Sequence, residues 1–109
     1  MKTKTRVVLI TVPVGEPAEE IAKTLVSERL AACVNHIEKI KSTYIWKGDL
    51  CRNNEGLLIV KTTADNVDAL IKRVTEIHPY EVPEVIALGV EEGLESYLDW
   101  ISSCVDHTL

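Results

Sequence analysis

The sequence predicts an α+β domain of the ferredoxin-like kind, a split βαβ sandwich with one long hairpin and an extra C-terminal helix. Three observations lead to this fold class. Strand-like apolar runs and amphipathic helical stretches follow one another in the order strand, helix, strand, and this order occurs twice. The two central strands are much longer than the first, and a further amphipathic stretch ends the chain. Because 109 residues suffice for one hydrophobic core, we expect a single domain over residues 1–109.

The first half of the chain begins with a strand and a helix. Residues 7–12, VVLITV, form a β-branched run without a polar face, as expected for a strand that is buried on both sides. Basic residues precede this run as in a signal peptide, but the run ends at Pro13 and no small-residue cleavage site follows. Residues 15–32 then predict a helix with Pro17 in its first turn. Its apolar face consists of Ala18, Ile21, Ala22, Leu25 and Val26.

The middle of the chain predicts a hairpin with strands at residues 34–46 and 50–62. Gly48 supplies the turn signal between them. The apolar residues of the first strand change their alternation phase, which indicates a bulge near Glu38 or Lys39. The residues that define the two phases are Ile37 on one side and Ile40, Tyr44 and Trp46 on the other.

This hairpin is too long for the other strands of the sheet. At ~3.3 Å per residue its strands reach ~40 Å, whereas residues 7–12 span only ~20 Å. The overhang leaves backbone groups unpaired beside apolar side chains, which a single molecule must cover. We therefore expect pairing with further copies of the chain in a cyclic homo-oligomer.

The second half repeats the pattern. Residues 63–78 predict a helix with Thr63 or Asp65 capping its start, residues 85–90 predict the last strand, and a third helix follows. The apolar positions of the second helix are Val67, Leu70, Ile71, Val74 and Ile77, and those of the third are Leu94, Tyr97, Leu98, Ile101 and Val105.

Composition excludes several function classes. The formal charge is −5 and the basic residues are scattered, so we expect no nucleic-acid partner. No stretch approaches the ~20 apolar residues of a membrane span, so we expect no membrane partner. The three cysteines lack a CxxC spacing, which indicates neither a disulfide framework nor a closed zinc site, and we expect a reduced, cytoplasmic protein. No hydrolase, metalloprotease, P-loop or dinucleotide motif occurs, so we do not expect an enzyme.

Five stretches of the sequence together resemble one known family, the CutA or divalent-cation-tolerance proteins. They are ERLAACVN at 28–35, STYIWKG at 42–48, LLIVKTT at 57–63, HPYEVPEVIAL at 78–88 and YLDWI at 97–101. The resemblance covers about residues 7–102 and implies a ferredoxin-like homotrimer, related in architecture to the nitrogen regulatory PII proteins. It also implies a role in tolerance of copper and other divalent metals. Thr11 to Val14 stand where many members have a small residue or a cysteine followed by Ala-Pro-Asn.

His78 is the candidate metal ligand. One interpretation is structural: an imidazole favours the end of a helix, and Pro79 stops it. The other makes a ring nitrogen of His78 a ligand of Cu²⁺ or another divalent cation, with Cys33 or a carboxylate completing the site and no organic cofactor. Cys33 also fits a small buried hydrophobic residue. His36 and His107 have no evident partner.

A second candidate site is a cleft between subunits. We expect Glu84 at the start of the last strand beside Lys61, with Tyr80 close by, so that these residues line the cleft. Alternatively, Glu84 forms an interfacial salt bridge with Lys61 or Arg73. Tyr44 and Trp46 flank the hairpin tip, where they either pack a subunit contact or stack on a ligand.

Three functions fit these observations. The leading hypothesis is a non-enzymatic homotrimer that takes part in divalent metal tolerance and binds divalent metal ions. The first rival is a signalling trimer of the PII type that binds a small anionic ligand in the clefts between subunits. The second rival is a trimeric scaffold for another protein.

Overall fold

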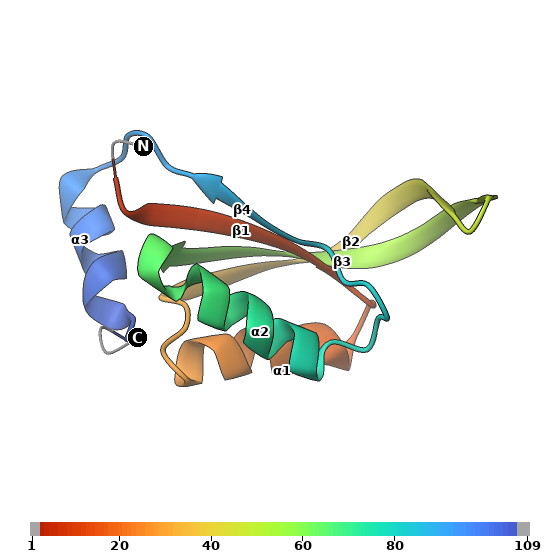
Figure 1. Ribbon diagram of the computed structural model, residues 1–109, viewed down its shortest axis with the longest axis horizontal. Coiled ribbons are helices and arrows are strands. Elements are labelled where there is room, and N and C mark those ends of the chain that lie inside the picture. The colour runs from red at the N-terminus through yellow and green to blue at the C-terminus, as the bar shows by residue number, and fades with distance from the viewer. Residues whose placement is uncertain (1–2, 107–109) are drawn as a thin grey trace.

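The computed structural model describes residues 3–106 and contains one sheet of four strands with three α-helices (Figure 1). In chain order the elements are β1 (Thr5–Val12), α1 (Glu16–Ser27), β2 (Cys33–Trp46), β3 (Asp49–Thr63), a short 3-10 turn (Ala64–Asn66), α2 (Val67–Ile77), β4 (Val85–Gly89) and α3 (Glu95–Cys104). The predicted order and the long hairpin are confirmed. His107 lies outside the described residues.

The sheet has the order β2-β3-β1-β4, and all its pairs are antiparallel. This is the ferredoxin-like arrangement that the sequence predicts. It leaves β2 and β4 as the two edge strands. Among the described residues, no helix is both long and apolar enough to span a membrane.

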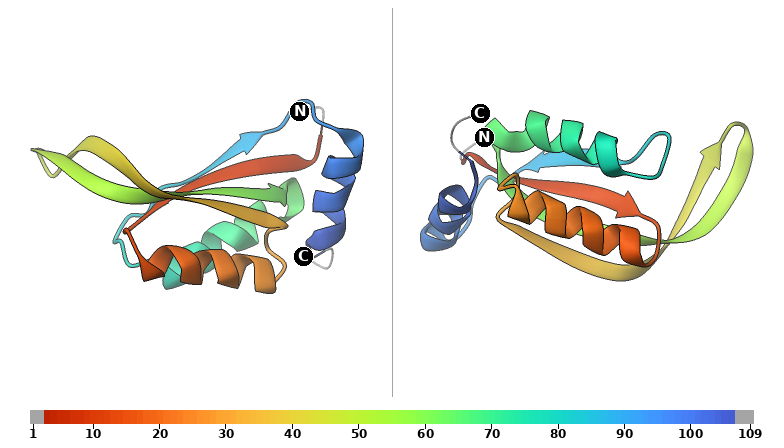
Figure 2. Two further views of the ribbon diagram at one scale, coloured as in Figure 1. Left: turned by 180° about the vertical axis from the view of Figure 1, so that it is seen from behind. Right: turned by 90° about the horizontal axis from the view of Figure 1, so that it is seen from below.

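The core lies between the sheet and the two helices α1 and α2, which cover the same face of the sheet (Figures 1 and 2). Alternate residues of β1 and β3, which point to the same face of a pleated sheet, are fully buried there. They pack against the apolar faces of the helices, and the central members of this cluster are Val8, Ile10, Leu58, Val60, Ile21, Leu25, Leu70 and Val74.

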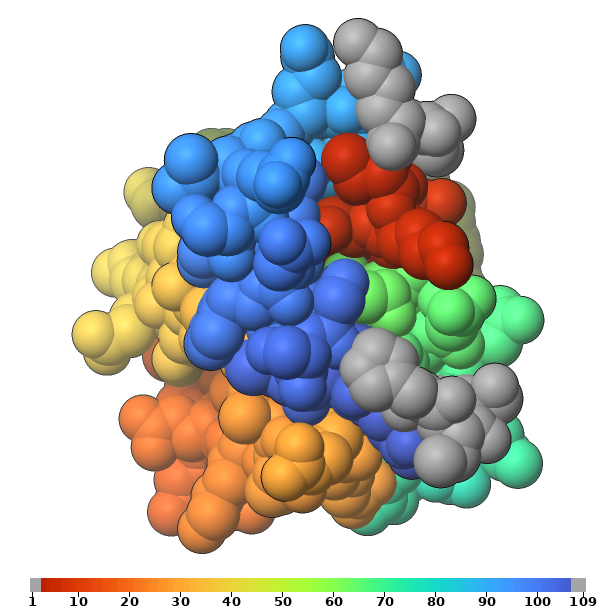
Figure 3. Space-filling model, turned by 90° about the vertical axis from the view of Figure 1, so that its left-hand side faces the viewer, coloured from red at the N-terminus to blue at the C-terminus, as the bar shows by residue number. Residues whose placement is uncertain are grey.

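The opposite face of the sheet, which we call the open face, is apolar and carries neither α1 nor α2. Strand alternation places Leu9 and Ile59 on this face, together with Ile86 of β4, which pairs with Leu9. The side chains of Ile37, Ile86 and Leu88 are between 43% and 50% exposed. α3 packs across the end of the sheet away from the hairpin (Figure 3), where Ile101 and Val105 form a small second cluster.

The predicted bulge is present in β2. Ile37 lies opposite Leu57 and Ile40 lies opposite Glu55, so that Glu38 and Lys39 together face a single residue of β3. Residues directly opposite each other share a face of the sheet. The bulge therefore returns the later apolar residues of β2 to the open face, which explains the change of phase in the sequence.

The hairpin leaves the sheet at Gly56. Residues 57–61 of β3 pair with both β1 and β2, whereas residues 49–55 have β2 as their one partner among the described strands. At the tip, Lys47 and Gly48 form a two-residue turn with φ angles of 51° and 85°, as a type I′ turn requires. Ile45 and Leu50 beside it are 65% and 68% exposed. The predicted overhang is confirmed.

The observed helix starts agree only in part with those predicted from the sequence. Pro17 lies in the first turn of α1, as predicted. The predicted cap of α2 is wrong, because neither Thr63 nor Asp65 caps it with its side chain. The Thr63 hydroxyl instead accepts a hydrogen bond of 2.9 Å from the buried amide of Asn66, and a 3-10 turn precedes the helix.

Candidate functional site

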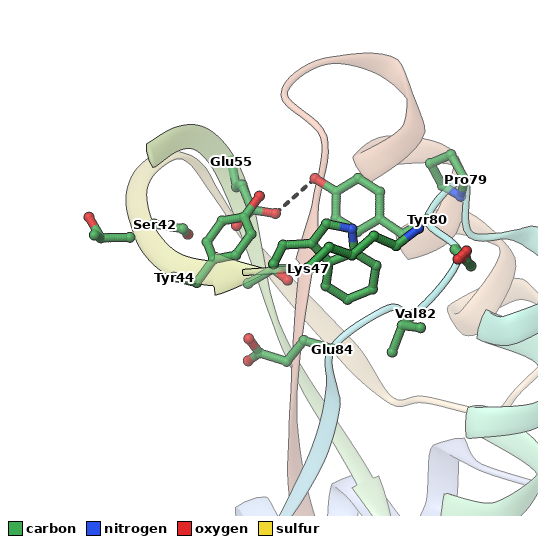
Figure 4. Close-up of a pocket in the computed structure, with 12 residues that line it drawn as sticks. Ser42, Tyr44, Lys47, Glu55, Pro79, Tyr80, Val82 and Glu84 are labelled. Atoms are coloured by element: carbon green, nitrogen blue, oxygen red, sulfur yellow. Dashed lines mark hydrogen bonds between the residues drawn. The ribbon is translucent and has the colours of Figure 1, made fainter. Parts of the chain in front are cut away.

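A pocket of about 740 Å³ lies where the hairpin leaves the sheet (Figure 4). The hairpin forms one side, and the segment 79–84 between α2 and β4 forms the other. The lining residues are Thr11, Ser42, Thr43, Tyr44, Trp46, Lys47, Glu55, Pro79, Tyr80, Glu81, Val82 and Glu84. We call this cavity the hairpin pocket.

The bulge of β2 builds the hairpin side of this pocket. Because Ile40 is opposite Glu55, the alternate residues Ser42, Tyr44 and Trp46 share the face of Glu55. Without the extra residue, these side chains would point to the other face of the hairpin. A feature of backbone pairing thus decides which side chains line the pocket.

His78 fixes the segment that forms the other side. α2 ends at Ile77 and Pro79 follows, as the sequence predicts. The Thr11 carbonyl accepts a hydrogen bond of 2.8 Å from His78 Nε2, and since a carbonyl only accepts, this nitrogen carries the proton. His78 Nδ1 then accepts the backbone N–H of Tyr80 at 3.1 Å. Both ring nitrogens of the buried imidazole are therefore engaged.

This imidazole also completes the sheet. β4 pairs with β1 only as far as Ile10, so that Thr11 is the next residue of β1 beyond the pairing. A buried carbonyl without a donor is costly, and His78 supplies the donor. Its ring lies 4.7 Å from the ring of Tyr80, centroid to centroid. His78 thereby positions Tyr80 at the pocket.

Tyr80 and Glu55 join the two sides of the pocket. The Tyr80 hydroxyl donates a hydrogen bond of 2.8 Å to Glu55 Oε2 (Figure 4), and the residue Glu55 is only 7% exposed. Burial, the hydrogen bond and the charge of Glu55 together raise the pKa of Tyr80 well above its usual value, burial being the largest cause. On the hairpin, Asn53 donates a hydrogen bond of 2.5 Å to the Tyr44 hydroxyl.

The charged groups of the lining are mainly acidic. Three carboxylates, those of Glu55, Glu81 and Glu84, surround a single ammonium group, that of Lys47. Within the described part of the chain, none of these four groups forms an ion pair. The Lys47 ammonium instead lies over the Trp46 ring, 5.8 Å from its centroid.

Four of the five residues predicted for a cleft lie together in this pocket, namely Tyr44, Trp46, Tyr80 and Glu84. Lys61 does not. The prediction that Glu84 lies beside Lys61 is wrong, because β1 separates β3 from β4 and Lys61 pairs with Val7 and Cys33. Within the chain Arg73 binds Glu28 at 3.0 Å and Glu76 at 3.3 Å, and the ion pair of Glu84 with Arg73 across a subunit interface stays a prediction.

The two predicted metal ligands are far apart in the sheet. Cys33 pairs with Lys61, which lies opposite Val7, whereas His78 contacts Thr11, four residues further along β1. The described residues contain no group of three or more His, Cys, Asp or Glu side chains able to hold a metal ion. Metal binding by His78 and Cys33 therefore stays a prediction, and the two side chains do not form a common site in this chain.

Sequence reasoning missed Glu55 and Lys47 as pocket residues. The sequence did contain a signal for Glu55. A two-residue turn at Lys47 and Gly48 places Trp46 opposite Asp49, and counting back along the hairpin to the bulge places Ile40 opposite Glu55. Glu55 therefore shares the face of Tyr44 and Trp46. Only the curvature of the hairpin, which no pattern indicates, brings Lys47 to the segment 79–84.

Fold and pocket together define a ferredoxin-like α+β domain with an overhanging hairpin and a ligand-sized groove at its root. The family described as CutA1 divalent ion tolerance protein matches residues 6–104. The divalent-cation tolerance protein CutA of Thermus thermophilus is 53% identical over 95 residues, which cover 87% of this chain and 92% of that protein. The protein CutA of Mus musculus is 49% identical over 84% of this chain, which spans only 52% of the mouse protein.

Solved structures agree with these sequence matches. The divalent cation tolerance protein Cut A1 of Thermus thermophilus superimposes with a TM-score of 0.91 at 49% identity, over 94% of this chain and 99% of that one. CutA1 of Oryza sativa gives a TM-score of 0.93 at 40% identity, over 99% of this chain and 100% of that one. The chain belongs to the CutA1 divalent ion tolerance family.

Proposed function

We propose that this chain acts as a homotrimer in the tolerance of divalent metal ions, by binding and without catalysing a reaction. Membership of the family supports the role in metal tolerance. The observation that carries the assembly is the overhang of the hairpin, in which residues 49–55 of β3 have β2 as their only partner strand within residues 3–106. A cytoplasmic location remains our expectation; one related structure is described as periplasmic and a rice relative as chloroplastic.

Two further features support the assembly. The open face exposes Ile37, Ile86 and Leu88, and the hairpin tip exposes Ile45 and Leu50. Apolar patches of this kind on a small domain are typical of interfaces. Among the described strands β2 and β4 form the two edges of the sheet, and joining the edge of one copy to the opposite edge of the next gives a head-to-tail contact. Such a contact closes into a ring when the rotation between copies brings the last copy back to the first.

Direct metal binding is tested by isothermal titration of the tag-free protein with Cu²⁺ and with Zn²⁺. The proposal expects binding tighter than the ~1 mM of scattered surface carboxylates. His78→Ala is expected to remove a site that uses this imidazole, while His36→Ala is the matched control. Weaker binding of both metals by the wild-type protein would mean that its part in metal tolerance involves no direct site.

The hairpin pocket favours a second function, that of a sensor whose trimer responds to a small ligand. Its volume of about 740 Å³ lies within the ~300–1,000 Å³ of small-molecule sites. By strand alternation its lining residues Ser42, Tyr44 and Trp46 lie on the side of the hairpin that continues the open face, so neighbouring copies in a ring would border it. The anionic ligand of this alternative was expected near Lys61, Tyr80 and Glu84, and Lys61 lies outside the pocket, so we argue the class of ligand from the lining itself.

A further inference from the structure

We propose that the hairpin pocket binds an organic ammonium ion, and specifically a linear polyamine. This inference rests on the proposed sensor function and names the ligand class of the same pocket. It follows from three features of the lining: aromatic rings, carboxylates without ion-pair partners, and an ammonium group of the chain that already lies against one ring.

Aromatic rings come from both sides of the pocket. Tyr44 and Trp46 project from the hairpin and Tyr80 from the segment 79–84 (Figure 4 labels the two tyrosines). The face of an aromatic ring carries negative charge and attracts an ammonium group within ~6 Å of its centroid. Trp46 is the strongest binder of the three rings, because tryptophan attracts a cation more strongly than tyrosine does. The apolar parts of the same rings accommodate methylene groups.

Lys47 shows the kind of group that the pocket accepts. Its ammonium lies 5.8 Å from the centroid of the Trp46 ring and forms no ion pair with a described carboxylate. The residue stands in the hairpin turn with a φ of 51°, and it lines the pocket from there. A ligand with an ammonium group would displace Lys47 from the ring.

The carboxylates set the sign of the ligand charge. Glu55 is nearly buried and keeps its orientation through the hydrogen bond from Tyr80, while Glu81 and Glu84 are exposed at the rim. An anionic ligand would face all three of these charges with only Lys47 to offset them. A divalent metal ion requires several converging ligands, and the described residues provide no such group.

The spacing of the lining favours an elongated ligand. Side chains two positions apart on a strand are ~6.6 Å apart, so that Tyr44 and Trp46 present two ring faces along the hairpin. Glu84 lies on the opposite side at the start of β4. A linear polyamine carries ammonium groups at intervals along an apolar chain, which matches an alternation of rings and carboxylates.

The test is a fluorescence titration with spermidine on the full chain in its native assembly. The protein has two tryptophans, and Trp100 lies on α3 at the far end of the molecule, so Trp100→Phe leaves Trp46 as the reporter. We expect a saturable change of Trp46 fluorescence with spermidine and none with glutamate at the same ionic strength.

Three variants in this background separate specific binding from general attraction. Glu84→Gln is expected to weaken spermidine binding at least fivefold, whereas Glu91→Gln, which removes an exposed charge away from the pocket, changes it less than twofold. Lys47→Met retains an unbranched side chain and removes the competing ammonium, so it is expected to tighten binding severalfold.

The inference is overturned by an absence of saturable spermidine binding to both the parent and the Lys47→Met protein. Equal weakening by Glu84→Gln and Glu91→Gln, or glutamate binding as tight as spermidine binding, overturns it as well. Saturable glutamate binding would overturn the polyamine and leave a small-ligand sensor in place, so failure of the inference is distinguishable from failure of the sensor function. None of these outcomes affects the metal titrations or the mass of the assembly.

Discussion

At the scale of single residues, His36 is a polar group in an apolar site. Its Nε2 atom is buried and has no hydrogen-bond partner among the described residues. The ring fits only because its neighbour is Gly56, where a Cβ atom would come within 3.1 Å of Nε2 and 3.0 Å of Val12 Cγ2. A buried nitrogen without a partner costs about 1–3 kcal/mol.

Replacing this histidine should therefore stabilise the protein. We expect His36→Leu to raise the free energy of unfolding by about 1–2 kcal/mol, because the new side chain has a similar size and no polar atom. Urea denaturation followed by circular dichroism measures the change. A lower free energy of unfolding for His36→Leu would show that the imidazole has a stabilising partner in the assembled protein.

Tyr80 links stability to pH. The folded state raises the pKa of its hydroxyl, so the unfolded state loses this proton first. The stabilisation of the folded state that the protonated Tyr80 hydroxyl provides is complete below the ordinary tyrosine pKa of about 10. It declines as the pH rises above that value.

We expect Tyr80→Phe to lower the free energy of unfolding by about 1 kcal/mol at neutral pH, because the buried carboxylate of Glu55 loses its hydrogen-bond donor. Between about pH 9 and pH 11, the wild-type protein should lose stability more steeply than the variant. Denaturant unfolding at each pH measures both slopes. Parallel slopes would contradict the assigned role of the Tyr80 hydroxyl.

Sequence reasoning identified the conspicuous pocket residues but not their partners. Tyr80 and Glu84 follow a helix end that Pro79 marks, so their place at a corner was predictable. Lys61 was assigned to the same place although the predicted ferredoxin-like strand order already puts β1 between β3 and β4. The tautomer of His78 depends on the end of the β1–β4 pairing, which only the folded structure defines.

At the scale of elements, the hairpin depends on its turn and its bulge. The bulge was predictable because one extra residue in a strand is what shifts its alternation pattern from one phase to the other. The start of α2 was not, because Thr63 and Asp65 both resemble caps while a distant contact decides the geometry: the Asn66 amide also donates to the Asp106 carbonyl at 3.1 Å.

The turn makes a separate prediction. Gly48 has a φ of 85°, and a Cβ atom there would meet no atom within 4 Å, so a substitution costs conformational energy alone. We expect Gly48→Ala to lower the free energy of unfolding by about 1 kcal/mol. Gly48→Asn should lower it clearly less, because asparagine tolerates a positive φ better than alanine does. The two thermal midpoints give the comparison, and equal midpoints would argue against a type I′ turn in solution.

At the scale of the whole molecule, the structure has two unlike faces. One face of the sheet is covered by α1 and α2, and the other remains apolar and open. The length of the hairpin already indicated from the sequence that the molecule needs partners. The open face was not predictable, because both sides of β1 and β3 carry apolar residues: Leu9 and Ile59 on the open side, and Val8, Ile10, Leu58 and Val60 on the buried side.

A charge on the open face should therefore prevent assembly. We expect Leu88→Lys, on β4, to shift the protein to a smaller species in size-exclusion chromatography, because a charge is costly in an apolar interface. Val26→Lys replaces a similarly exposed apolar residue on α1 and serves as the control. Unchanged elution of both variants would place the interface elsewhere.

The most direct test of the account is the mass of the wild-type protein in solution. Light scattering at micromolar protein concentration should give three times the chain mass of 12.1 kDa, and the value should persist on dilution. A stable mass of 12.1 kDa would contradict the account, because the hairpin and the open face would then lack the partner copies that their exposed strands and side chains require.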